Sequence, residues 1–92
     1  MTLKSNKVFK IIKKTANNYH YLYRLMGSGE ESESNMYSIF VELIMPDGKK
    51  SCASCENAFS NIEAALDFFN KLVSNLVTPI NLLYVIEDEL KN

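Results

Sequence analysis

Residues 60–76 read SNIEAALDFFNKLVSNL, and at this point the apolar spacing changes from alternation to a helical repeat. Ser60 followed by Glu63 has the form of a capping box, in which the serine oxygen and the glutamate satisfy amides of the first turn. The apolar residues that follow recur every three or four positions and form one stripe: Ile62, Ala65, Leu66, Phe69, Leu72, Val73 and Leu76. We therefore predict a helix that begins at Ser60 and buries this stripe.

A second helix is predicted directly afterwards, in residues 78–90, TPINLLYVIEDEL. Thr78 suits the N-cap, and Pro79 suits the first helical position, where no amide hydrogen is needed. The apolar stripe of this helix consists of Leu82, Val85, Ile86 and Leu90. Three acids, Glu87, Asp88 and Glu89, stand in its last turn, where the helix dipole already places negative charge. We expect a basic neighbour there, such as the lysine-rich N-terminal segment.

Before residue 60 the apolar residues alternate, which is typical of strands. Residues 35–45, NMYSIFVELIM, place Tyr37, Ile39, Val41, Leu43 and Met45 on one face and Ser38, Phe40, Glu42 and Ile44 on the other. The tripeptide PDG at 46–48 then predicts a turn into a short strand, KKSCASCE, at 49–56.

Residues 7–26 are predicted to form a hairpin. KVFKIIKK at 7–14 is compatible with a strand, in which Phe9 and Ile11 alternate with Val8 and Ile12, or with a short helix. We prefer the strand because TANN at 15–18 suits a tight turn and YHYLYRLM at 19–26 is rich in β-favouring tyrosines. The tyrosine strand places Tyr19, Tyr21, Tyr23 and Leu25 on one face.

The predicted fold class is therefore α+β, an antiparallel meander of about four strands followed by two C-terminal helices packed on one sheet face. Ninety-two residues with 47% apolar content are the size of one small domain, 1–92. The polar segment GSGEESESN at 27–35 is expected to be a flexible acidic loop. No apolar run suits a signal peptide or a membrane span, which favours a cytoplasmic protein with no membrane contact.

The two cysteines, Cys52 and Cys55, have the spacing of zinc knuckles and thiol oxidoreductases. A structural zinc site needs four ligands, and the chain offers only these thiols and His20. In a strand, an interval of three residues also directs the two thiols to opposite faces. No metal or cofactor is predicted, and a thiol-based metal or redox protein is kept as an alternative function.

A second alternative is a single-stranded nucleic-acid binder that uses the basic N-terminal hairpin. Lysines 7, 10, 13 and 14 lie near tyrosines on which bases could stack. The net charge of −1 disfavours nucleic acid as a partner, and core and cross-strand packing is the better explanation of the tyrosines, because a small core needs them as filling. No sequence neighbour suits His20 for acid–base chemistry, so no catalytic residue is predicted and the protein is not expected to be an enzyme.

The strand at 35–45 is apolar on both faces, whereas two helices cover only one face of a sheet. Phe40 and Ile44, joined by Leu22 and Met26, are therefore predicted to form an exposed patch that a homodimer buries about a two-fold axis. The acids Glu87, Asp88 and Glu89 are expected to add to the surface that contacts an unidentified protein. The leading hypothesis is a non-enzymatic protein-interaction module.

Three segments, YLYRL, MYSIFVEL and above all LVSNLVTPINLLYVIEDEL, resemble an uncharacterised family of short proteins from clostridia and related Gram-positive bacteria, a domain of unknown function. The resemblance rests on a terminal (Ser/Thr)-Pro-x-x-Leu-x-x-Val-Ile-Glu-Asp helix, matched by Thr78, Pro79, Leu82, Val85, Ile86, Glu87 and Asp88. Asn81 departs from it, since members are expected to carry histidine there. The resemblance implies no activity.

Overall fold

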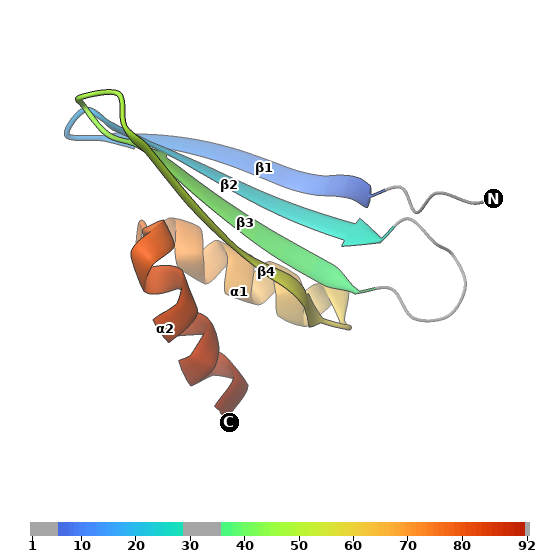
Figure 1. The fold of residues 1–92 in the computed structure, drawn as a ribbon. Coiled ribbons are helices and arrows are strands. Elements are labelled where there is room, and N and C mark those ends of the chain that lie inside the picture. Colours follow the sequence, from blue (N-terminus) through green and yellow to red (C-terminus); the bar gives the residue numbers. More distant parts are fainter. Residues whose placement is uncertain (1–5, 29–35, 92) are drawn as a thin grey trace.

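The computed structural model describes residues 6–28 and 36–91, and it confirms the predicted α+β meander (Figure 1). Four antiparallel strands form one sheet in the order β1-β2-β3-β4, and two helices follow. Their bounds are β1 Asn6–Ala16, β2 Tyr19–Ser28, β3 Tyr37–Ile44, β4 Lys50–Phe59, α1 Ile62–Ser74 and α2 Pro79–Lys91. Both helices lie on the same side of the sheet, which we call the inner face, and the other side is the open face.

Two tight turns set the register of the hairpins. Asn17 and Asn18 have φ angles of 53° and 68°, the left-handed pair that a two-residue hairpin turn requires, and they leave Ala16 paired with Tyr19. At the other hairpin the amide of Gly48, whose φ is 92°, donates to the carbonyl of Met45 over 2.8 Å. Both turns lie where the sequence predicts them, because few residue types adopt positive φ.

The core lies between the inner face and the helices. Its fully buried large side chains come from both layers: Tyr23 and Leu25 of β2, Ile39 and Val41 of β3, Phe68, Phe69 and Leu72 of α1, and Leu82 of α2. The predicted stripe of α1 omits Phe68, whose ring lies 5.3 Å from that of Phe59. The Tyr23 hydroxyl donates to the carbonyl of Val77 over 3.0 Å, which ties β2 to the connection between the helices.

The predicted start of α1 is wrong by one residue. Asn61, not Ser60, is the N-cap, and its Oδ1 accepts from the amides of Glu63 at 2.7 Å and Ala64 at 3.3 Å. Asparagine and serine cap helices about equally well, so the sequence offered two adjacent caps. With Asn61 in that position, Glu63 is the second helical residue and does not complete the predicted capping box.

A register shift between Val8 and Lys10 corrects the alternation predicted for β1. The extra residue, Phe9, contacts Tyr37 edge to face at 5.5 Å between ring centroids. A bulge of this kind lets two residues oppose one and moves the following side chains to the other face. Val8 and Ile11 consequently share the open face, whereas Ile12 packs against the core.

Three strands run further than the sequence predicts, and β1 does so by one residue at its start and two at its end. β2 continues through Gly27 to Ser28, and the remainder of the predicted acidic loop, residues 29–35, lies outside the described residues. β4 continues to Phe59 by way of Asn57, whose φ is 52° and whose amide donates to Ser38 Oγ over 2.9 Å. The pairing of β4 with β3 shifts in register at this point. After the shift, Phe59 lies opposite Tyr37 and is buried.

The predicted second helix is confirmed, with Pro79 as its first residue and the Thr78 carbonyl accepting from Leu82 over 3.0 Å. The basic neighbour of its acidic end is Lys71 of α1, whose Nζ lies 3.1 Å from Glu89 Oε1. The N-terminal strand does not fill that role, since α2 packs mainly on β4 and β1 is the opposite edge of the sheet. Within the described ranges, no helix is long and apolar enough to cross a bilayer.

Candidate functional site

The open face is a grid of side chains set by the pairing of the strands. Cross-strand partners place these residues together in successive rows: Val8, Met26 and Ser38; Ile11, Arg24, Phe40 and Ser54; Lys13, Leu22, Glu42 and Cys52; Thr15, His20, Ile44 and Lys50. Residues directly opposite each other in antiparallel strands have Cβ atoms about 5 Å apart. Each row therefore forms a continuous strip across the sheet.

The four residues predicted as an exposed patch, Leu22, Met26, Phe40 and Ile44, all lie on this face. Ile44 is 36% exposed and the other three are half-buried. Val8 and Ile11, which are 48% and 49% exposed, enlarge the patch beside Met26 and Arg24. The sequence analysis missed these two residues because strict alternation places them on opposite faces. We call the six residues together the apolar patch.

Three pairs on the open face join polar groups to one another or to the patch. The Arg24 guanidinium lies 5.3 Å from the centroid of the Phe40 ring, a cation–π geometry. Glu42 Oε2 lies 3.2 Å from Lys50 Nζ, and Thr15 Oγ1 lies 3.3 Å from His20 Nδ1. Such exposed pairs add little stability, but they hold charge of both signs at defined places among the apolar side chains.

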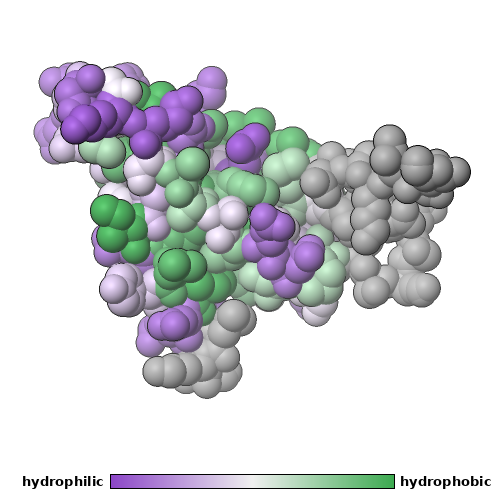
Figure 2. Space-filling view, in the orientation of Figure 1, coloured by the Kyte–Doolittle hydropathy of each residue, from purple (hydrophilic) through white to green (hydrophobic). Residues whose placement is uncertain are grey.

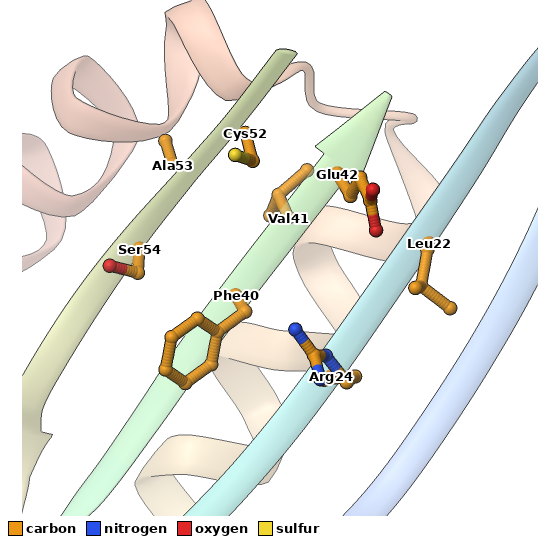
Figure 3. A pocket seen from close by; sticks show the side chains of 8 residues that line it. All are labelled: Leu22, Arg24, Phe40, Val41, Glu42, Cys52, Ala53 and Ser54. Atoms are coloured by element: carbon orange, nitrogen blue, oxygen red, sulfur yellow. The ribbon is translucent and has the colours of Figure 1, made fainter. Parts of the chain in front are cut away.

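Two hollows interrupt this face. The first, of about 340 Å³, lies between β2, β3 and β4, and Figure 3 shows the side chains around it. Arg24 and Phe40 lie at one end of this hollow, and Glu42 and Cys52 lie at the other. The second hollow, of about 360 Å³, lies beside His20 and Ile44 near the β1–β2 turn. The surface is thus uneven, as a surface that fits the side chains of a partner must be.

The structure places the two cysteines on opposite faces of β4, as the sequence predicts. Cys52 is exposed opposite Glu42, and Cys55 is buried opposite Ile39. Burial raises the pKa of the Cys55 thiol, which disfavours its reactive thiolate form. Among the residues that the structure describes, no three His, Cys, Asp or Glu side chains are grouped as metal ligands would be.

The tyrosines and lysines of the hairpin do not form one exposed platform. Tyr23 is buried on the inner face, and the ring of Tyr21 stacks on it at 6.2 Å. Lys10 also points inward, with Nζ 5.9 Å from the centroid of the Phe69 ring. Lys13 lies on the open face, whereas the side chain of Lys7 is outside the described residues. Tyr19, at the start of β2, is 36% exposed, and stacking of bases on this hairpin stays a prediction.

The acids predicted to contact a partner lie on α2, in the layer behind the sheet, and so not beside the apolar patch. Glu87 and Asp88 are exposed, and Glu89 is half-exposed beside Lys71. The same helix carries a feature that the sequence analysis missed, an exposed stripe of Ile80, Leu83 and Tyr84, which are 75%, 59% and 71% exposed. Their spacing of three and four residues was the available signal. We call these three residues the α2 stripe.

Comparison with known proteins gives one match. A family model described as "Family of unknown function (DUF6514)" matches residues 3–92, nearly the whole chain. No curated protein matches the chain, and no solved structure matches it. The match agrees with the resemblance of the sequence to an uncharacterised family. The chain therefore belongs to DUF6514, a family of unknown function.

Proposed function

We propose that the protein is a non-enzymatic interaction module and that two copies associate through their open faces. The observation that supports this proposal is the apolar patch itself, six apolar side chains on a side of the sheet that neither helix covers. Contiguous exposed apolar surface on a small domain marks an interaction site. Two sheets that pack face to face bury such side chains in a layer about 10 Å thick.

The dimensions of the open face suit this association. Four strands spaced by about 4.8 Å, each with about eight residues along the grid, cover roughly 20 Å by 26 Å in projection. That projected area, roughly 500 Å², is of the same order as the accessible area of about 800 Å² that each partner of a stable complex buries. The face is thus large enough for one second copy.

The charged residues of the open face also suit association of two identical copies, because a cation of one copy can lie beside an anion of the other. A two-fold axis that crosses the strands along the row of Tyr23, Val41 and Ala53 lays β2 of one copy antiparallel over β2 of the other, with Arg24 over Leu22. Arg24 of β2 then stands beside Glu42 of the second copy, because Leu22, two residues from Arg24, is the residue that pairs with Glu42. The symmetric pair forms as well, so each cation gains an anion.

We propose the cytoplasm as the compartment, since both cysteines are free thiols.

Replacement of Phe40 by aspartate tests the proposal. The change puts a charge at the centre of the patch in both copies, and it is expected to halve the mass of the wild-type assembly in sedimentation equilibrium. Ala64→Asp, at an exposed position of α1, is the matched control and is expected to keep the wild-type mass. Circular dichroism verifies that both variants are folded. An unchanged mass for Phe40→Asp refutes association through the open face.

A further inference from the structure

The free edge of β4 differs from the other edge of the sheet. β1 and β4 each pair on one side only, so each presents unpaired backbone amides and carbonyls. β1 carries Lys10, Lys13 and Lys14, charges that keep a second strand away. In β4, residues 51–55 read SCASC and carry no charge. The backbone of β4 is therefore open to pairing with another strand.

The charges that flank this segment are placed symmetrically. Lys50 and Glu56 are both exposed, and each lies three residues from Ala53. When two copies of β4 pair antiparallel about a two-fold axis through Ala53, Lys50 of each copy lies opposite Glu56 of the other. The same register places Cys52 opposite Ser54. A two-fold antiparallel pairing centred on any other residue of β4 loses the two Lys50–Glu56 ion pairs. The charge pattern therefore selects the register centred on Ala53.

The α2 stripe lies at the same edge. α2 packs mainly on β4, with Leu82 fully buried and Ile80, Leu83 and Tyr84 turned away from the core. Figure 2 shows apolar side chains exposed over α2, on the side of the molecule where β4 is the near strand in Figure 1. A two-fold axis normal to the sheet keeps both copies of α2 on one side of the joined sheet. The two stripes then flank the axis.

We infer that the β4 edge and the α2 stripe together form a second self-association surface, at which a second copy of this chain adds its β4 antiparallel and extends the sheet. In this register residues 50–56 of the two copies pair over about 23 Å, and a sheet with one helix layer is about 20 Å thick, so the contact covers roughly 460 Å² in projection, of the same order as one side of a standard interface. This surface does not overlap the open face. With both surfaces in use, two kinds of perpendicular two-fold axis generate a tetramer.

Disulfide trapping tests the register. In Ser54→Cys, the new thiol lies opposite Cys52 of the second copy, and cross-strand neighbours are close enough for a disulfide. Diamide takes two hydrogen atoms from the two thiols and is reduced to the hydrazine. The variant is expected to form covalent dimers at least about tenfold faster than wild type. Lys49→Cys, which the register places opposite Asn57, is the control and is expected to match wild type.

Mass measurements separate this inference from the proposed function. Leu83→Glu, at an exposed site where the fold tolerates a charge, is expected to halve the wild-type mass, and the double variant with Phe40→Asp is expected to be a monomer. Equal masses for wild type and Leu83→Glu, or no faster trapping in Ser54→Cys than in Lys49→Cys, overturn the inference. Disulfides of Ser54→Cys with a different protein in native lysate, in place of the self-dimer, overturn it too. If Phe40→Asp alone keeps the wild-type mass, only the open-face proposal fails.

Discussion

Tyr23→Phe removes a hydroxyl that joins β2 to the connection between the helices. The side chain is fully buried, and its hydroxyl donates to the carbonyl of Val77, which is also buried. The substitution leaves that carbonyl without its donor, and such a loss costs about 1–3 kcal/mol. The free energy of unfolding near pH 8 is therefore expected to be lower by this amount in the variant.

The same burial makes the wild-type protein sensitive to alkali. Desolvation, with a smaller contribution from the nearby Tyr21, raises the pKa of Tyr23 from about 10 to about 12. The folded-state pKa lies above the unfolded one, so the stabilisation is complete below pH 10 and is lost as pH rises towards 12. Two pKa units correspond to about 2.7 kcal/mol. The variant lacks this ionisation. The difference by which its free energy of unfolding falls below that of wild type near pH 8 should therefore shrink to zero or reverse by pH 12.

Urea unfolding followed by circular dichroism from pH 8 to pH 12 measures the difference between the two proteins. The comparison cancels the titration of the lysines and the other tyrosines, which both proteins share. Tyr84→Phe is the control, because Tyr84 is 71% exposed and its removal should leave the pH dependence as in wild type. A difference between wild type and Tyr23→Phe that stays constant from pH 8 to pH 12 would refute the reasoning.

Two further predictions concern the helix cap and the thiols. Asn61→Ala should lower the free energy of unfolding by about 1 kcal/mol in urea titrations, because the Asn61 side chain accepts from first-turn amides. Ser60→Ala should lower it by less than about 0.5 kcal/mol. A larger loss in Ser60→Ala than in Asn61→Ala would show that Ser60 is the cap. In the monomeric double variant with Phe40→Asp and Leu83→Glu, Cys52 should react with a chromogenic disulfide reagent at least about tenfold faster than Cys55, which is buried and has a raised pKa. Cys52→Ser should abolish the fast phase, and two equal rates would contradict the assignment.

The elements that the sequence predicts correctly depend on neighbours along the chain. The Asn17–Asn18 turn follows from tolerance of positive φ, and the helices follow from their apolar period. The opposite placement of Cys52 and Cys55 follows from alternation in a strand. One error arises where two neighbouring residues, Asn61 and Ser60, are about equally good helix caps. The other arises at Phe9, where one extra residue in the strand reverses the face to which the following side chains point.

The candidate surfaces show the same division. Alternation along β2 and β3 was enough to place Leu22, Met26, Phe40 and Ile44 on one face, because side-chain direction in a strand repeats every two residues. Val8 and Ile11 joined that face only through the bulge in β1. The spacing of Ile80, Leu83 and Tyr84 puts them on one side of a helix, but only the position of α2 on β4 shows that this side is uncovered.

By itself the sequence determined the order of the elements, the turns between the strands and the side of the sheet on which most residues lie. Each of these is decided by backbone preferences and by periodicity within about ten residues. Only the tertiary structure decided that α2 packs on β4, that Lys71 meets Glu89 and that Ile80, Leu83 and Tyr84 stay uncovered. Those outcomes depend on how whole layers fit together, and contacts between residues distant in the chain leave no periodic trace in it.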